Sequence, residues 1–325
     1  MNLLVTGGAG YVGGAVARRL RAAGHAVTIL DDLSTGHRKN VETFDFVEAD
    51  MADRAAIEPL FQRRRIEGIV HMAALCLVGA SVRDPEAYYD HNLRRPLVLL
   101  DLALRAGVGR FVFSSSAAVY GEPDTTPIEE DHPTRPTNPY GETKLAFERA
   151  LAWHAAARGT VAVALRYFNA AGATDDGAHG EQHAEETHLV PNVLRAALGG
   201  APIAIFGTDY PTPDGTAVRD YVHIEDLAEA HRLALEHAAP AGRLTVFNLG
   251  SGQGASVREV IDTARRVTGR PIPVVASARR PGDPARLVAS HARAREGLGW
   301  RAARGDLAGI LESAWRFARS VSGGR

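Results

Sequence analysis

Tyr140 and Lys144 have the spacing of two residues that can act together as a base. Residues four apart on a helix lie on one face, so the lysine ammonium can sit beside the tyrosine phenol. A nearby positive charge lowers the pKa of a tyrosine from its usual value near 10, and the phenolate can then take a proton from a hydroxyl group. This spacing also occurs by chance. Lys144 is, however, one of only two lysines among 37 basic residues, the other being Lys39, and this scarcity favours a specific role.

A third candidate, Ser116, ends the run 110–116. That run is expected to be a parallel strand, and open α/β sheets present ligands at the carboxyl ends of their strands. A hydroxyl at such a position can hydrogen-bond a reacting oxygen. Ser114 and Ser115 precede it, so a polar strand end without a chemical role is the alternative interpretation. We predict Tyr140, Lys144 and Ser116 as the catalytic residues.

The chain begins with a glycine-rich turn that fits a dinucleotide. The run 2–6 predicts a strand, Gly7, Gly10 and Gly13 follow it, and a helical pattern begins directly afterwards. Glycines let the backbone turn tightly and approach a pyrophosphate, while the N-terminus of the helix offers unpaired N–H groups. Glycine-rich turns are common, so a purely structural turn is the alternative.

An acidic residue at the end of the next predicted strand indicates which nucleotide binds. Asp31 follows Gly13 by 18 positions, where a carboxylate hydrogen-bonds the adenosine ribose hydroxyls and repels a 2′-phosphate. The pattern therefore predicts NAD rather than NADP, although Arg38 could accommodate the extra phosphate. Asp50 ends the third predicted strand and is expected near the adenine, with a solvated acid as the alternative.

The elements that must position these residues alternate along the chain. Helix-length segments separate strand-like runs at 2–6, 26–30, 44–50, 68–74, 110–116 and 161–168. This alternation is typical of an α/β fold, here a Rossmann-type doubly wound parallel sheet. We predict an NAD-binding domain over 1–169 and a smaller, discontinuous C-terminal substrate lobe over mainly 170–325. Segments near 221–250, a helix over 221–236 and a strand over 245–249, are expected to return to the large sheet.

Composition excludes several classes of protein. The chain has 325 residues, of which 45% are hydrophobic and 23% charged, the balance of a globular protein. The net charge of -1 gives no field that would hold nucleic acid or a membrane surface. The sequence shows neither a signal peptide nor a membrane-length apolar run. Cys76 is the only cysteine, which suits a reducing compartment, and we expect a cytoplasmic protein. His179 and His183 lie in a glycine-rich loop without repeated ligand spacing, so no metal site is expected.

A resemblance to a known family is carried by six segments: 6–13, 114–121, 139–144, 166–169, 204–221 and 279–283. Together they resemble the extended short-chain dehydrogenase/reductases, and among these the UDP-glucose 4-epimerases. The similarity runs nearly end to end. The first three segments are shared across the superfamily, whereas 204–221 is much more specific to the 4-epimerases.

The resemblance implies reversible C4 epimerisation of UDP-glucose and UDP-galactose through a 4-keto intermediate, with transient hydride transfer to bound NAD. It implies that Tyr140 takes the proton of the sugar 4-hydroxyl while Ser116 shares the hydrogen bond to that oxygen. The keto sugar then rotates, and hydride and proton return on the opposite face. The resemblance further implies a homodimer built on helices near 92–107 and 140–158.

Binding residues are also implied by the resemblance. For NAD they are Gly7, Gly10, Tyr11, Val12, Gly13, Asp31, Asp32, Asp50, Met51, Met72, Ala73, Ala74, Cys76, Asn92, Ser114, Tyr140, Lys144 and Phe168. For the UDP-sugar they are Ser116, Tyr140, Asn169, His188, Leu189, Ala204, Ile205, Phe206, Arg219, Arg280, Asp283 and Leu287. A guanidinium forks well onto phosphate oxygens, which suits the two arginines to the nucleotide diphosphate.

The chain departs from the family pattern at several positions. Cys76 stands where many 4-epimerases have a lysine that helps to hold NAD, so weaker cofactor retention is expected. Leu287 stands at the wall of the hexose pocket and leaves the acceptance of N-acetylhexosamines open. Ala117 and Ala118 stand where 4,6-dehydratases carry an acid/base pair, which speaks against dehydration.

Two alternatives to a UDP-glucose 4-epimerase are kept. One is a 4-epimerase of another nucleotide sugar, such as a UDP-N-acetylhexosamine, UDP-glucuronate or a UDP-pentose. The other is an NAD-sensing protein without catalysis, which would be expected to lose Tyr140, Lys144 or Ser116.

Overall fold

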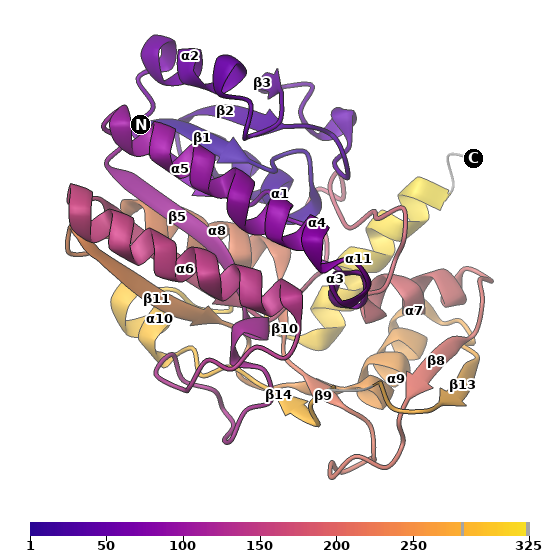
Figure 1. Ribbon diagram of the computed structural model, residues 1–325. Helices are drawn as coiled ribbons and strands as arrows, with labels where there is room; N and C mark the ends of the chain where they lie inside the picture. Colours follow the sequence, from indigo (N-terminus) through magenta and orange to yellow (C-terminus); the bar gives the residue numbers. More distant parts are fainter. Residues whose placement is uncertain (281–282, 323–325) are drawn as a thin grey trace.

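Seven parallel strands form the central sheet in the computed structural model, which describes residues 1–280 and 283–322 (Figure 1). Their order is β11-β6-β5-β4-β1-β2-β3, so the direction of strand addition reverses between β1 and β4. The strands are β1 (Asn2–Thr6), β2 (Ala26–Asp31), β3 (Asp45–Glu48), β4 (Gly68–His71), β5 (Arg110–Ser116), β6 (Val161–Tyr167) and β11 (Arg243–Leu249). The predicted Rossmann-type α/β fold is confirmed. Open sheets of this kind bind ligands at the reversal, beyond the carboxyl ends of the strands.

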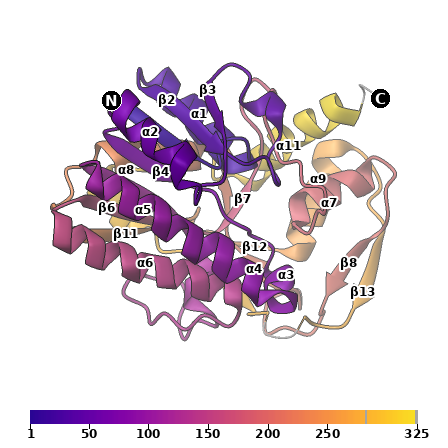
Figure 2. The same ribbon diagram turned by 45° about the horizontal axis from the view of Figure 1, so that its top comes forward.

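Helices cover both faces of the sheet because the pleat sends successive side chains to opposite sides. In β1, Leu3 and Val5 pack into the same apolar cluster as Leu227, whereas Leu4 between them packs into the cluster of Leu100 on the other face. The first face carries α1 (Tyr11–Ala22), α8 (Ile224–Glu236) and α10 (Ala292–Leu298). The second face carries α2 (Arg54–Arg64), α5 (Arg95–Arg105) and α6 (Pro139–Arg158) (Figure 2). Among the described residues, no helix is both long and apolar enough to cross a membrane.

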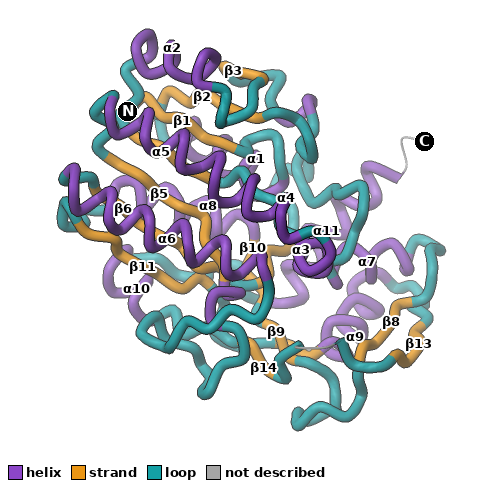
Figure 3. The backbone as a smooth tube through the Cα atoms, in the orientation of Figure 1, coloured by secondary structure: helices purple, strands orange, loops and turns teal. Residues whose placement is uncertain are grey.

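A second, smaller group of elements lies beyond the carboxyl ends of the sheet strands (Figure 3). Its core is built by Val193, Ile205, Val260 and Ile310. These residues belong to α7 (Leu189–Ala197), β8 (Ile203–Phe206), α9 (Val257–Thr268) and α11 (Leu307–Ser322). Short strand pairs complete it: β7 (Asn169–Ala171) with β10 (Tyr221–His223), β8 with β13 (Val274–Ser277), and β9 (Val218–Arg219) between β12 (Ala255–Ser256) and β14 (Arg286–Leu287).

The remaining short helices precede or follow sheet strands. They are α3 (Val78–Arg83), α4 (Pro85–Tyr89), a π-helical segment (Asp90–Arg94) and two 3-10 turns (Arg38–Asn40 and Ala117–Tyr120).

One predicted helix boundary is wrong. The helix expected from Tyr221 begins at Ile224, because Tyr221–His223 forms β10 and pairs with β7 in parallel. His223 then caps the helix, its Nδ1 accepting the backbone N–H of Glu225 at 3.1 Å. The strand expected over 245–249 begins two residues earlier, at Arg243, and lies against β6. The division of the chain at residue 169 stays a prediction.

Candidate active site

The start of α6 packs closely onto the end of β5, and this packing brings Tyr140 to Ser116. Pro139 begins the helix, and the side chain of Asn138 caps it by accepting the N–H of Gly141 at 2.9 Å. A Cβ on Gly141 would lie 2.4 Å from the carbonyl oxygen of Ala118, two residues after Ser116. Only glycine therefore permits this approach of the helix to the turn that follows β5.

The three predicted catalytic residues are brought together. The Ser116 side chain lies close enough to the Tyr140 hydroxyl to favour the ionised form of the phenol. Lys144 lies one helical turn after Tyr140, its Nζ 5.8 Å from the centroid of the tyrosine ring. The same Nζ donates a 2.9 Å hydrogen bond to the backbone carbonyl of Ser114 in β5, which fixes the ammonium at the strand end. The geometry places a hydroxyl, a phenol and an ammonium at one edge of the sheet.

Burial controls the charges of this group. The Tyr140 side chain is only 8% exposed, and burial raises the pKa of its phenol well above the usual value. Burial also lowers the pKa of the Lys144 ammonium to about 8. His71 is buried nearby, where burial and the charge of Lys144 lower its pKa to about 3, so that its ring is neutral at pH 7. At pH 7 the phenol is therefore neutral, and the ammonium beside it keeps its proton. Such a phenol needs further positive charge nearby before it can ionise and act as a base.

Cys76 is an exposed thiol at the margin of this group. Negative charge on it would raise the pKa values of Tyr140, Tyr167 and Lys144, so the thiol lies within electrostatic reach of all three. The loop that carries it is held by Asn92, whose side-chain amide accepts from the N–H of Leu75 at 2.8 Å and donates to its carbonyl at 2.9 Å. The Asn92 side chain thus fixes the predicted cofactor loop by bonding the backbone of Leu75.

The glycine turn between β1 and α1 has no room for side chains. Gly7 has a left-handed backbone (φ +71°), and a Cβ on Gly13 would lie 2.1 Å from the carbonyl oxygen of Gly7. Asp31 at the end of β2 accepts the N–H of Ala9 in this turn at 3.0 Å and that of Leu33 at 2.9 Å. Burial raises the pKa of this carboxyl. A carboxylate has about four acceptor positions, so two remain for ribose hydroxyls.

Gly13→Ala is expected to reduce the NAD content of the purified protein by at least about tenfold and to lower its melting temperature. The added methyl group meets backbone atoms, which cannot move without opening the turn. NAD released on denaturation and quantified by absorbance would check the first effect, and calorimetry the second. Gly109→Ala is the matched control, because a Cβ there meets nothing within 4 Å. Equal NAD content in both variants would contradict the role of this turn.

Other predicted cofactor residues are held in place by contacts with their neighbours. Thr6 Oγ1 accepts the N–H groups of Met72 and Ala73 at 3.2 and 3.3 Å, which ties the end of β4 to β1. Asp50 pairs with Arg95 at 2.6 Å. The Tyr11 hydroxyl donates to the carbonyl of Gly172 at 2.7 Å.

Three further predictions concern side chains near these strands. Asp32 accepts the N–H of Ser34 at 2.9 Å, so it caps the loop after β2. Arg38, the residue that could have held a 2′-phosphate, is ion-paired with Glu48. The side chain of Ser114 faces α8, where its Oγ lies 2.8 Å from Nε2 of His231, so its carbonyl rather than its hydroxyl faces Lys144.

The predicted sugar-nucleotide residues lie on the short strands of the second group. Arg219 in β9 is ion-paired with Asp283, and Leu287 in β14 is its register partner. The Arg280 guanidinium lies 4.0 Å above the ring of Phe206, the last residue of β8. Both arginines therefore have a fixed place beside predicted binding residues.

The remaining predicted residues of this set sit at element ends. Asn169, in β7, is the register partner of Tyr221 in β10. His188 precedes α7 and Leu189 begins it. Ala204 and Ile205 lie within β8. Phe168 is buried directly after β6, with Leu145 in the same apolar cluster.

The sequence analysis missed Asp220, a buried acid between Arg219 and Tyr221. Its carboxylate accepts from Ser251 N and Oγ at 2.7 and 2.6 Å, and from Gly252 N and Ala289 N at 3.0 Å each. The Asp220 side chain thus links the end of β9 to the loop after β11 and to the segment after β14. The sequence feature that could have pointed to Asp220 is its position inside the segment 204–221, which resembles the 4-epimerases.

The comparisons with known proteins agree with this geometry. A family model described as the NAD dependent epimerase/dehydratase family matches residues 3–250. The chain belongs to this NAD dependent epimerase/dehydratase family. The resemblance found in the sequence is thereby confirmed.

Relatives in this family match over nearly their whole length. The chain is 51% identical to a "UDP-glucose 4-epimerase" of Corynebacterium glutamicum over 99% of this chain and 97% of that protein. It is 47% identical to one of Lacticaseibacillus casei, over 98% and 96%. A crystal structure of UDP-glucose-4-epimerase from Stenotrophomonas maltophila, with bound NAD and formylated UDP-arabinopyranose, superposes with a TM-score of 0.96 at 40% identity over the whole of both chains. One from Bifidobacterium longum in complex with NAD+ and UDP superposes at 0.94 with 37% identity, again over both whole chains.

The family's cofactor fits the residues present. Side chains are excluded from the turn of Gly7 and Gly13, where a pyrophosphate must approach the backbone. The carboxylate of Asp31 keeps free acceptor positions at the end of β2, as the ribose of NAD requires. The order of strand addition reverses between β1 and β4, beside the glycine turn that follows β1, and β2 with Asp31 is the next strand of the sheet.

Proposed function

We propose that the protein interconverts UDP-glucose and UDP-galactose as an NAD-dependent 4-epimerase. The observation that carries the proposal is the group at the end of β5, where the Ser116 side chain acts on the Tyr140 phenol and Lys144 places near it an ammonium fixed by a strand carbonyl. The glycine turn and Asp31 supply a dinucleotide site at the same edge of the sheet. Together they offer a base for the proton of a sugar hydroxyl and a place for the cofactor that would take the hydride from the same carbon.

The side chains divide the work. A bound NAD would supply the acceptor for a hydride from C4 of the sugar. Tyr140 accepts the proton of the 4-hydroxyl and gives it back, and Ser116 holds the same oxygen through a second hydrogen bond. Lys144 stabilises the phenolate form of Tyr140 and keeps its position through the Ser114 carbonyl. Since the residues that hold the nucleotide are separate from these three, the sugar can turn between the two proton transfers.

Arg219 and Arg280 hold the nucleotide diphosphate in this proposal. Each is placed by a neighbour in the second lobe, Arg219 by Asp283 and Arg280 by the ring of Phe206. A guanidinium that is already oriented loses less side-chain entropy when it binds phosphate oxygens. Leu287, beside Arg219 in the strand register, would border the sugar.

The experiment that tests the function incubates the purified protein with UDP-galactose, with and without added NAD, and resolves the two sugars by NMR. Conversion without added NAD supports both the epimerase and a retained cofactor, and conversion only with NAD supports a weakly held one. No conversion under either condition contradicts the proposal. UDP-N-acetylglucosamine, UDP-glucuronate and UDP-xylose serve as parallel substrates, and a faster reaction with one of them would replace the proposed sugar.

Cys76→Lys is expected to raise NAD content and turnover by about 2- to 5-fold, the range of an exposed charge pair. A positive charge within reach of Tyr140 and Lys144 lowers the pKa of the phenol, where negative charge on the thiol would raise it. Cys76→Gln is the control for side-chain length without charge. Identical NAD content and rate in the wild type and both variants would show that this position does not limit cofactor retention.

We further propose a homodimer formed through α5 and α6, which lie side by side on one face of the sheet (Figure 2). Trp153 of α6 is 78% exposed, which is unusual for so large an apolar side chain and is explained by burial against a second copy. Trp153→Glu is expected to shift the mass measured by sedimentation from dimer to monomer. A monomeric wild type would contradict this part. The exposed free thiol of Cys76 suits the cytoplasm as the proposed location.

A further inference from the structure

A second group of titratable side chains lies on the segment between β7 and α7. It consists of Glu181, His183, Glu186 and His188, and one ligand atom from each lies within 4.8 Å of all the others. No metal site was predicted here, because His179 and His183 lie in a glycine-rich loop without repeated ligand spacing. The fold instead turns the segment so that His183 faces His188, with ring centroids 5.5 Å apart and planes tilted by 57°.

Three distances within this Glu/His group are close to those between the ligands of a tetrahedral ion. Nδ1 of His183 lies 3.3 Å from Oε1 of Glu181 and from Oε2 of Glu186, and Nδ1 of His188 lies 3.3 Å from the other oxygen of Glu186, Oε1. Ligands bound at about 2.1 Å to a tetrahedral ion are about 3.4 Å apart. The pair His188–Glu181, at 2.6 Å, is closer and would open by roughly 0.8 Å.

Burial and charge also suit a divalent cation. The side chain of Glu186 is fully buried and that of Glu181 is 7% exposed, so two carboxylates share a space poor in water. His183 and His188 pair with these carboxylates, and a divalent ion bound between the four groups would replace those pairs. Two neutral imidazoles, two carboxylates and one divalent ion give a net charge of zero. His188 is 45% exposed, which leaves the ion a route of entry.

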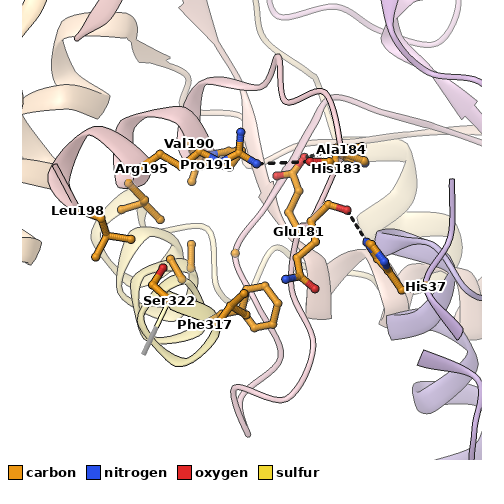
Figure 4. Close-up of a pocket in the computed structure, with 16 residues that line it drawn as sticks. His37, Glu181, His183, Ala184, Val190, Pro191, Arg195, Leu198, Phe317 and Ser322 are labelled. Carbon is orange, nitrogen blue, oxygen red and sulfur yellow. Dashed lines mark hydrogen bonds and ion pairs between the residues drawn. The ribbon is translucent and has the colours of Figure 1, made fainter. Parts of the chain in front are cut away.

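The backbone that carries the Glu/His group is tied to α7. Asn192 donates to the carbonyl of Glu186 at 3.2 Å, and Arg195 donates to the carbonyl of His183 at 3.4 Å. Figure 4 shows the second of these bonds, with Glu181 and His183 on the wall of a cavity of about 480 Å³ that also reaches Phe317. Ligands held by a helix keep the geometry that an ion requires.

We propose that Glu181, His183, Glu186 and His188 bind a divalent transition-metal ion, with Zn²⁺ the best match. Imidazole nitrogen and carboxylate oxygen in a tetrahedral set are ligands that Zn²⁺ accepts, and four protein ligands make the site structural. The bound ion would fix the segment that presents His188 and Leu189. The proposal does not depend on the epimerase activity.

The test measures Zn²⁺ binding to the full chain without an affinity tag, after removal of bound metal by a chelator. Isothermal titration is expected to give one Zn²⁺ per chain, and Co²⁺ is expected to give the intense visible absorption of a tetrahedral complex. His183→Gln and Glu186→Gln are each expected to weaken Zn²⁺ binding by at least about 100-fold, since each removes a direct ligand. Circular dichroism checks that the variants are folded.

Two variants are the matched controls. Glu185→Gln removes an exposed acid of the same segment that is not in the Glu/His group, and Cys76→Ser removes the thiol that could bind zinc elsewhere. Both are expected to bind Zn²⁺ like the wild type. Absence of stoichiometric binding would leave the Glu/His group as protonated histidines paired with carboxylates and overturn the proposal. So would loss of binding in either control, or retention of it in folded His183→Gln and Glu186→Gln.

Discussion

Replacing Tyr140 with phenylalanine is expected to lower the turnover of UDP-galactose by about 10³-fold, within the range that a positioned acid or base contributes. The variant lacks only the hydroxyl whose ionisation the Ser116 side chain favours. The ring itself keeps its edge-to-face contact with Tyr88, whose centroid lies 6.4 Å away, so the packing survives. NAD content is therefore expected to stay within about twofold of the wild type, which separates loss of chemistry from loss of cofactor.

Tyr88→Phe provides the matched control for Tyr140→Phe. It removes a hydroxyl from the neighbouring ring, but one that donates to the carbonyl of Leu77 at 2.6 Å. Loss of that hydrogen bond costs about 1 kcal/mol of stability, and turnover is expected to change by a few-fold at most. NMR of UDP-galactose conversion measures both variants. Turnover in Tyr140→Phe above a tenth of the wild-type rate would rule out the phenol as the base.

Local patterns were sufficient to predict the large sheet. The run 110–116 is buried on both faces, and β5 has the same limits. The pairing of Tyr221–His223 with Asn169–Ala171 could not be seen in this way, because it joins segments about fifty residues apart along the chain. The two-residue strands β9, β12 and β14 are too short to show any periodicity.

That Tyr140 and Lys144 lie together could be predicted because their spacing is a property of one helix. Tyr140 and Lys144 share a face of α6, and Ser116 ends a recognisable strand. The group that orients Lys144 is a backbone carbonyl, and a carbonyl leaves no trace in a sequence. The Glu/His group was missed for a related reason, since His183 and His188 are five apart in a loop and meet only because the loop turns before α7.

Lys144→Met is expected to abolish turnover to a similar degree as Tyr140→Phe, about 10²- to 10³-fold, and yet to make the protein more stable at pH 7. Lys144 is buried, and burial lowers the pKa of its ammonium to about 8 from 10.5. Keeping that charge in the folded state costs free energy. Methionine fills the same space without charge. It cannot make the hydrogen bond to the Ser114 carbonyl, and this loss offsets about 1 kcal/mol of the gain in stability.

The pH dependence separates this cost from other effects of the substitution. Below pH 8 the folded and unfolded states of the wild type both hold the proton, and the cost is constant. Between pH 8 and 10.5 only the unfolded state holds it, so the free energy of unfolding of the wild type rises relative to Lys144→Met, by about 1.4 kcal/mol per pH unit. The two proteins are expected to differ by up to about 2 kcal/mol in favour of Lys144→Met at pH 7, and this difference disappears towards pH 9.5.

Urea unfolding of both proteins at pH 7, 8 and 9, after removal of NAD so that its binding energy does not enter, measures the difference. Lys39→Met is the matched control, because the chain's other lysine is exposed and donates to Gln182 at the surface. It is expected to follow the wild type in both stability and turnover. A parallel pH course for the wild type and Lys144→Met would mean that Lys144 is not a strained ammonium. Its effect on Tyr140 would then have to come from position alone, because a charge that costs nothing to bury is already neutralised by its surroundings.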